Sequence, residues 1–391
     1  MDKKAPISST AQNARFIQAG VNAAFQDRIG EATDVEFNFL GPSTDDKGNF
    51  VTDQLVEARI SSARHVTDFR GVRLAVIAAG TWRWTTAATE HFADLRQSAA
   101  ASTDVDRMVA YASLIVGNMP VLRARQGEHV AIVAVDFHPY LDFRQTLLHG
   151  LQHSSTEMDE KGPALALARY LDMESTAEEP YLHFSDGATV RFEQSSPGVH
   201  KISSITPGLA AARVLEDAFY LSTESQMFFQ GNFPDATVEL DVEKAAATVS
   251  YSGGQMTANA VLIATISDEE FTWAWADPKL KDTAAARLAR NLARFGIDEA
   301  VPELVRPHLP LPMARGHQLP HLALPILGIW TLAGAKLADA RVGLVLLDAP
   351  QLHLPEPTPA ATEATLSVPP PSWINADRAR AAYGSFRGVD V

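Results

Sequence analysis

One tryptophan motif occurs twice in the sequence, and this repetition constrains the fold more than any other feature. Thr81-Trp82-Arg83-Trp84 recurs as Thr272-Trp273-Ala274-Trp275, so four of the six tryptophans in 391 residues stand in a Thr-Trp-x-Trp pattern. Because tryptophan is rare, such a coincidence between unrelated segments is improbable. An internal repeat indicates a chain built from copies of one structural unit.

The strands predicted around the two motifs follow the same order. Apolar and polar residues alternate strictly at 35–39 and again at 238–242, ahead of each motif. That period of two predicts a strand with one buried face and one solvated face. An apolar strand that ends in Asp136 closes the first half, and another that ends in Asp348 closes the second.

The helices predicted after the motifs also correspond. An apolar segment with an internal glycine follows each motif, at 112–122 and at 323–332, and both segments predict a buried helix. Asp277-Pro278 is a favourable helix start, and it predicts a further helix over 278–294.

This order predicts an α+β fold with two tandem homologous domains, each an antiparallel sheet packed against helices. Asp186-Gly187 predicts the turn of a hairpin between the two domains. The predicted parts are a first repeat domain at 1–138, a connecting insertion with helices and a hairpin at 139–205, a second repeat domain at 206–353, and a Pro-rich linker and C-terminal tail at 354–391.

Composition excludes several classes of protein. The chain has 33 basic and 47 acidic side chains, a formal net charge of −14, and no cysteine. Acidity disfavours binding to nucleic acid or to an anionic membrane, since phosphate binding requires basic surface. The lack of cysteine excludes a disulfide scaffold and a cysteine nucleophile. No apolar segment follows the N-terminal residues, so the sequence predicts no signal peptide and we expect a cytoplasmic protein.

The strand around the second motif resembles a known family. Residues 271–278, Phe-Thr-Trp-Ala-Trp-Ala-Asp-Pro, are similar to an uncharacterised, largely actinobacterial family marked by a Gly-Thr-Trp-x-Trp strand that ends in Asn-Pro. The resemblance covers residues 206–350 and, more faintly, the first half through Gly80 and the motif that follows it. Asp277 replaces the usual Asn, and the second half lacks the Gly before its motif. The resemblance implies a domain of unknown function and supplies no catalytic residues.

The tryptophans of the two motifs are the first candidate site. Trp82 and Trp84, like Trp273 and Trp275, are two residues apart, so each pair shares one face of a strand. The functional interpretation is an aromatic wall that stacks on a ligand or a partner. The alternative, which we favour, is packing of each sheet against its helices.

Three arginines after the second motif are the second candidate site. Arg287, Arg290 and Arg294 have the spacing of one helical face, near a helix start whose dipole favours anions. A contact with a small anionic ligand is the functional interpretation. A solvated helix face is the alternative, and we favour it because helices commonly expose charge.

Histidines four residues apart raise the question of a metal site. His149 and His153 have this spacing, as do His317 and His321, and on a helix each pair would share one face. Two ligands do not make a tetrahedral site, so we expect no metal and no cofactor.

These patterns lead to a binding or scaffold protein as the first hypothesis. Its partner is predicted to be another protein or a small anionic ligand, with no nucleic acid and no membrane. The alternative is an enzyme in the groove between the two repeats, with Asp136 and His138 as an acid–base pair beside the arginines. No histidine stands at the matching place after Asp348. The oligomeric state stays open, and a monomer with pseudo-twofold symmetry is one arrangement.

Overall fold

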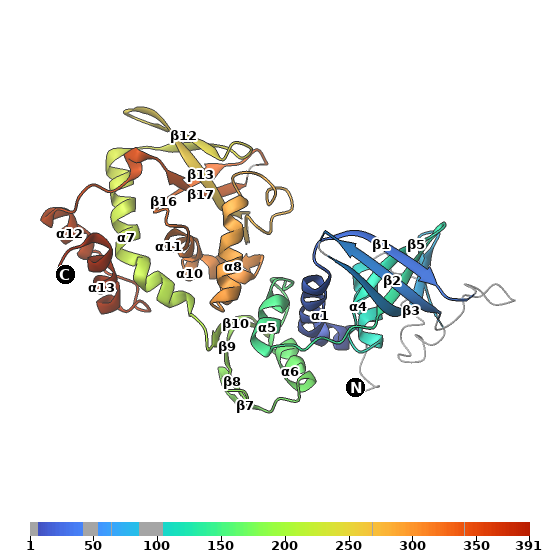
Figure 1. Ribbon diagram of the computed structural model, residues 1–391. Helices are drawn as coiled ribbons and strands as arrows, with labels where there is room; N and C mark the ends of the chain where they lie inside the picture. The colour runs from blue at the N-terminus through green and yellow to red at the C-terminus, as the bar shows by residue number, and fades with distance from the viewer. Residues whose placement is uncertain (1–6, 42–53, 64, 86–104, 268, 340) are drawn as a thin grey trace. The chain divides into compact units, whose positions relative to one another are not determined.

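The computed structural model divides into two units, and both contain antiparallel sheets and helices (Figure 1). This confirms the predicted α+β class. The first unit comprises residues 1–150, 161–175 and 184–186, and the second comprises residues 151–160, 176–183 and 187–391. Within these ranges the structure describes residues 7–41, 54–63, 65–85, 105–267, 269–339 and 341–391.

A six-stranded antiparallel sheet forms the centre of the first unit. The strand order is β1-β2-β3-β6-β5, and β4 pairs with the end of β3. The predicted strand at 35–39 is confirmed as part of β1. The strands are β1 (Ala32–Phe39), β2 (Leu55–Ser62), β3 (Val66–Ala78), β4 (Thr81–Trp84), β5 (Val121–Gln126) and β6 (His129–Val135).

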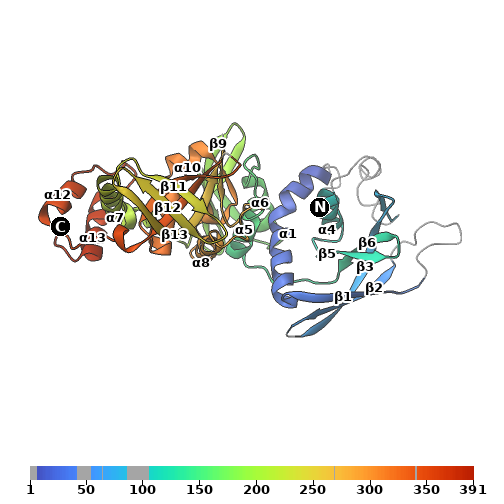
Figure 2. The same cartoon turned by 90° about the horizontal axis from the view of Figure 1, so that it is seen from above.

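The long N-terminal helix of the first unit organises its other helices. Helix α1 packs against α4 and α6, and Figure 2 shows α1 beside α4. Glycine lets α1 and α5 approach closely: a Cβ on Gly20 would lie 2.5 Å from Thr146, and one on Gly150 would overlap the ring of Phe16. The helices are α1 (Ile7–Ile29), α4 (Val105–Ile115), α5 (Phe143–Leu151) and α6 (Lys161–Tyr170).

The second unit has a seven-stranded sheet in which five strands close into a ring. The order is β12-β11-β16-β17-β13-β14-β15, and β12 pairs with β13 as well. Strand β11 pairs in parallel with β16 through Val238 and Ala335, which completes the ring. The strands are β11 (Thr237–Asp241), β12 (Ala246–Tyr251), β13 (Gly254–Ile266), β14 (Glu270–Trp273), β15 (His308–Pro310), β16 (Thr331–Lys336) and β17 (Val342–Asp348).

The C-terminal segment folds back onto the second unit. Helix α13 packs along α7, where Tyr383 donates a hydrogen bond to Glu224 at 3.1 Å and Arg378 contacts Asp217 at 2.7 Å. The helices are α7 (Ala211–Asn232), η1 (Arg287–Ala289), α8 (Arg290–Asp298), α9 (Pro302–Val305), α10 (Leu311–Gly316), η2 (Leu319–Leu322), α11 (Ala323–Leu327), η3 (Pro350–Leu352), α12 (Pro359–Leu366) and α13 (Ala376–Arg387).

A four-stranded antiparallel ribbon lies between the two sheets in the sequence. Its order is β10-β9-β8-β7, and β8 pairs with β9 around the Asp186-Gly187 turn. Gly187 has a φ of +88°, a conformation that suits glycine. The predicted hairpin is therefore confirmed. The strands are β7 (Ser175–Glu178), β8 (Tyr181–Phe184), β9 (Thr189–Ser196) and β10 (Val199–Thr206).

The two apolar segments with an internal glycine are each a helix followed by a strand. The prediction of one continuous helix over 112–122 and over 323–332 is wrong. Helices α4 and α11 end ahead of Gly117 and Gly328, whose φ angles are +73° and +68°, and β5 and β16 begin shortly afterwards. A glycine in this left-handed conformation ends a helix. The apolar residues beyond it pack as strands in the sheet.

The helix predicted over 278–294 is wrong in its first part. The segment consists of turns, then η1, and the α-helix spans only Arg290–Asp298. Ala285 explains the interruption, because its N–H donates to the carbonyl of Val242 and its own carbonyl accepts from Leu262. A residue whose backbone bonds to the turn after β11 on one side and to β13 on the other cannot also complete a helical turn.

The two sheets share a register as well as an order. Strands β3 and β13 each span 13 residues, and each has a bulge opposite the closing strand, between Arg73 and Ala75 and between Leu262 and Ala264. A bulge inserts an extra residue and bends the strand. The bulge therefore provides a common reference point for comparing the two sheets.

Two pairs of residues that the sequence aligned lie at the same distance from the bulge in their respective sheets. Val35 in β1 and Val238 in β11 occupy the same position relative to the bulge, through their pairing with β2 and β12. Asp136 and Asp348 likewise follow equivalent residues of β6 and β17.

Candidate functional site

The strand register shifts the tryptophan alignment by two residues. Trp84 lies opposite the alanine that follows the bulge of β3, whereas Trp273 lies opposite the corresponding alanine of β13. Trp84 therefore corresponds to Trp273, and Trp82 corresponds to Phe271. The residue-by-residue alignment of the two motifs is therefore wrong. The prediction that Trp273 and Trp275 share one face of a strand is also wrong, because β14 ends at Trp273 and Trp275 lies in the turn that follows. Each strand carries an edge-on aromatic pair, with ring centroids 5.1 Å apart in the first unit and 4.8 Å in the second.

The candidate tryptophans differ in burial. Trp273 is fully buried, and its Nε1 donates to the carbonyl of Glu303 at 2.9 Å. Trp82 is also buried, while Trp84 and Trp275 are half-buried. Packing within the core accounts for the two buried rings. A ligand contact by the half-buried pair stays a prediction.

The arginine stripe lies on the surface, and two of its three members have acidic neighbours. Arg290 in α8 contacts Asp282 at 2.8 Å, and Arg294 contacts Asp298 at 3.7 Å. Arg287 opens η1 and is exposed. The acidic neighbours offset much of the positive charge that an anion would need, which favours the solvated-face alternative.

Each closing strand ends in an aspartate–histidine pair. His138 Nε2 lies 3.2 Å from Asp136 Oδ1, and His353 Nε2 lies 2.9 Å from Asp348 Oδ1. No histidine stands two residues after Asp348, where the sequence has Pro350, and the contact is made instead by His353, five residues after the aspartate. The two pairs therefore have different spacings along the chain. Use of these pairs in acid–base catalysis stays a prediction.

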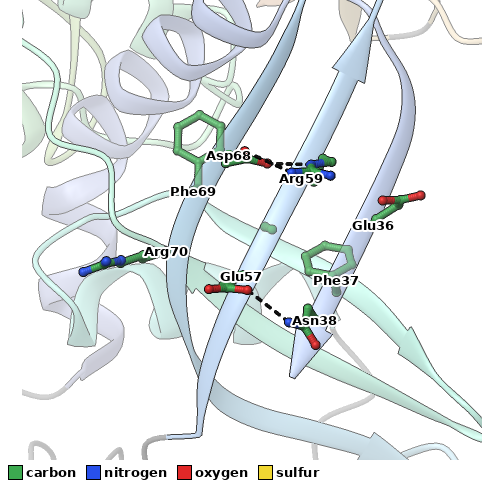
Figure 3. A pocket seen from close by; sticks show the side chains of 9 residues that line it. Glu36, Phe37, Asn38, Glu57, Arg59, Asp68, Phe69 and Arg70 are labelled. Atoms are coloured by element: carbon green, nitrogen blue, oxygen red, sulfur yellow. Dashed lines mark hydrogen bonds and ion pairs between the residues drawn. The ribbon is translucent and has the colours of Figure 1, made fainter. Parts of the chain in front are cut away.

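One face of the sheet in the first unit carries two rows of polar side chains across three strands, which we name the polar face. Cross-strand pairing aligns Glu36, Arg59 and Asp68 in one row and Asn38, Glu57 and Arg70 in the other. Arg59 Nε donates to Asp68 at 2.8 Å, and Asn38 donates to Glu57 at 3.0 Å (Figure 3). The hydrogen bond from Arg59 lowers the pKa of Asp68.

A hollow of about 680 Å³ lies at these strands. The intervening residues Phe37, Ala58 and Phe69 complete its lining. Successive residues of a strand point to opposite faces, so these apolar side chains face the core. Phe69 accordingly packs against Phe25 of α1, with ring centroids 5.2 Å apart. The core holds the three strands in place and leaves the polar face accessible.

Strand β1 forms an edge of this sheet. Among the described strands β1 pairs only with β2, whereas β11, at the equivalent place, pairs with both β12 and β16. An edge strand presents unpaired backbone N–H and C=O groups to an incoming chain. The two units therefore differ at the strand that carries Val35 in one and Val238 in the other.

The direction of the β1 backbone groups follows from one hydrogen bond. Leu40 N–H donates to the carbonyl of Leu55, its cross-strand neighbour, at 2.9 Å. In an antiparallel pair, the backbone N–H and C=O groups of successive residues point alternately toward the partner strand and away from it. The N–H groups of Phe37 and Phe39 therefore point to the open edge. The N–H of Val35 also points to the open edge, and it donates to the side chain of Asp34.

Within the second unit, a buried charge cluster fastens the loop at 151–160 to β10 and to Arg306, the residue after α9. Glu160 is fully buried and accepts from Arg306 Nε and Nη2 at 2.9 and 2.8 Å, and from Ile202 N–H at 2.7 Å. Lys201 Nζ lies 3.4 Å from the same carboxylate. Burial by itself would raise the pKa of Glu160, but the two cations and the hydrogen bonds lower it below its usual value.

Glu303 in α9 is a second buried carboxyl group next to this cluster. Burial raises its pKa to about 7, while the nearby charge of Arg306 opposes the shift. Shifted pKa values mark candidate functional sites, but structural ion clusters produce them as well. Because the side chain is enclosed, its titration affects stability more directly than ligand contact.

The described part of the chain has neither a membrane-spanning helix nor a ready-made metal site. In those residues no helix is long and apolar enough to cross a membrane, and no three His, Asp or Glu side chains are placed to share a metal ion. The histidine pairs do not share helices, since α5 ends before His153 and α10 ends before His317.

The polar face was missed at the sequence level. The signal was present, since Glu57 and Arg59 alternate with apolar residues as strictly as Glu36 and Asn38 do. Strand periodicity shows that these side chains share a face. Only the register shows which of them lie opposite one another.

Each unit contains a mainly antiparallel sheet with a bulged central strand, a long helix ahead of it and helices folded back after it. Residues 212–350, from α7 to the start of η3, match a family of unknown function, DUF6882. This confirms resemblance to a family of unknown function for the second half; the actinobacterial type and the shared motif stay predictions. No curated protein and no solved structure matches the sequence.

Proposed function

We propose that the protein is a binding protein whose first unit takes up an extended segment of another polypeptide along β1. One observation carries the proposal: β1 has one neighbour among the described strands, and its equivalent β11 has two. Strand addition to an exposed edge is a recurrent mode of peptide recognition, in which main-chain hydrogen bonds supply affinity and alternate side chains supply specificity.

The side chains of β1 define the partner's chemistry. Asp34 and Glu36 point to the polar face and are exposed, and β1 contains no basic residue. Phe37 and Phe39 point to the apolar side and are half-buried. A partner strand that alternates basic and apolar residues would match both faces, because side chains on neighbouring strands meet on the same face.

Internal duplication is the second part of the proposal. Support comes from the equivalent valines of β1 and β11, the equivalent aspartates at the ends of β6 and β17, and the left-handed glycines Gly117 and Gly328. The two copies of one domain would then have diverged where β11 pairs with β16, because β1 has no such second neighbour among the described strands. We assign the binding role to the cytoplasm, in line with the absence of cysteine.

Amide hydrogen exchange with a synthetic octapeptide of alternating lysine and valine tests the binding site. We expect the peptide to slow exchange at the amides of Phe37 and Phe39, because it would pair with them. A peptide of alternating glutamate and valine should bind about tenfold more weakly, since it places acidic side chains beside Asp34 and Glu36.

Val35→Pro is the matched variant, because proline hinders the pairing of an incoming strand with β1 and leaves every hydrogen bond between β1 and β2 in place. Val35→Thr serves as its control and should bind as the unmodified chain does. Unchanged exchange at Phe37 and Phe39 in the presence of peptide would contradict the proposal. Equal binding of the basic and acidic peptides would overturn the predicted partner chemistry.

A further inference from the structure

A second hollow, of about 350 Å³, lies in the second unit. Its walls come from α7, from the turn between α11 and β16, from the end of β17, and from the last turn of α13. The side chains that matter are Trp330, Asp348, His353, Phe386 and Arg387. The volume is within the lower range of small-ligand sites.

Two aromatic rings form a corner of this hollow. The centroids of Trp330 and Phe386 lie 5.9 Å apart, with the rings inclined at 64°. Phe386 is 56% exposed, so its ring is accessible to a ligand. The faces of aromatic rings carry partial negative charge and attract cations, with tryptophan the strongest.

Asp348 adds a full negative charge to the same hollow. His353 Nε2 lies 2.9 Å from Asp348 Oδ1 and restricts the orientation of the carboxylate. The Asp348 side chain is 44% exposed, so it remains accessible to a ligand.

The arginine among the named residues is already neutralised. Arg387 lies 2.9 Å from Glu224 and also donates to the carbonyl of Pro355 at 2.7 Å, and its side chain is only 12% exposed. The remaining charge of the hollow is therefore that of Asp348. Carboxylate and ring faces together favour a positive ligand and disfavour an anion.

From this arrangement we propose that the hollow binds a small organic ammonium ion, with its positive charge between Asp348 and the faces of Trp330 and Phe386. Loss of water from the aromatic corner and attraction to the carboxylate act together at this site. The inference is independent of the strand-addition site, because it concerns different residues in the other unit.

Choline and its uncharged isostere 3,3-dimethylbutan-1-ol are the probes for the test, by calorimetric titration of the full chain. The two molecules have nearly the same shape and differ in charge. We expect choline to bind at least about tenfold more tightly than the alcohol. Equal binding of the two, or no binding of choline, would overturn the proposal.

Three variants locate the site. Asp348→Asn and Phe386→Leu should each weaken choline binding by about fivefold to tenfold, since each removes one attraction. Both positions are exposed enough for the fold to survive the change. Asp136→Asn, at the equivalent position of the first unit, is the matched control and should leave choline binding unchanged. Undiminished binding in Asp348→Asn, or equal loss in Asp136→Asn, would refute the assignment.

Discussion

The second unit closes five strands into a ring, whereas the described part of the first unit leaves the corresponding strands as an open sheet. The central strands have the same length and equivalent bulges, so the difference does not arise there. It arises where β11 meets β16 through Val238 and Ala335. Closure removes an edge, and an open edge is available for another chain. One strand pairing therefore decides whether a sheet of this kind has an open edge.

The helices that follow the last strand show the opposite relation. In each unit they fold back onto the first long helix, α6 onto α1 and α13 onto α7. The contacts have different chemistry, because α1 uses Gly20 to admit its neighbour α5 closely, whereas α7 uses the carboxylates of Asp217 and Glu224 to bind α13. The same layout is thus stabilised by close packing in one unit and by ion pairs in the other.

The buried charge cluster of the second unit should give the largest effect. Arg306→Met leaves Glu160 without its bidentate partner, and we expect a loss of about 3–5 kcal/mol in the free energy of unfolding, measured by urea denaturation. Arg294→Met breaks an exposed pair and should cost less than about 1 kcal/mol. Similar losses in both variants would show that burial does not distinguish them.

Proline at the equivalent positions of β1 and β11 tests the open edge directly. Val238→Pro removes an N–H from a strand with neighbours on both sides, and the expected loss is about 3 kcal/mol. Val35→Pro removes an N–H that points away from β2, so the expected loss is below about 1 kcal/mol. Thermal unfolding of the two variants provides the measurement. Equal destabilisation would mean that β1 is covered as β11 is.

The pKa of Glu303 predicts a pH dependence confined to the second unit. The pKa rises from 4.5 to about 7 on folding, so between these values the folded state holds a proton that the unfolded state releases. Stability should therefore fall as pH rises from 4.5 to about 7, by on the order of 3 kcal/mol. Glu160, Glu193 and Arg306 face the same group.

Glu303→Gln should remove this slope, because the amide does not titrate, and denaturation at several pH values measures it. Glu299→Gln, an exposed carboxyl group outside α9, is the control and should retain the slope. A slope that persists in Glu303→Gln would assign the titration to another group.

The helix packing of the first unit should give the smallest effect. Gly150→Ala would place a Cβ against the ring of Phe16, and we expect a loss of about 1–3 kcal/mol from overpacking. Gly231→Ala makes the same change in α7, where nothing lies within 4 Å, and should stabilise the chain by about 0.5–1 kcal/mol. A neutral Gly150→Ala in thermal unfolding would show that α1 and α5 can separate without cost.

Sequence patterns were most informative where neighbours along the chain determine the outcome. Alternation correctly predicted the strand at 35–39, and Asp186-Gly187 correctly predicted a hairpin turn. The glycine-containing apolar segments were misinterpreted because hydrophobicity does not reveal a left-handed φ at Gly117 or Gly328. The alignment of the tryptophans failed because short motifs can match at a shift that the strand register excludes.

By itself the sequence determined the α+β class and the positions of several strands, since these depend on local periodicity and turn residues. Only the tertiary structure decided that β11 meets β16, that His353 pairs with Asp348, and that Arg306 pairs with Glu160 from far along the chain. Such contacts depend on how strands and loops close in space. Local sequence carries little information about that closure, and both proposed sites depend on it.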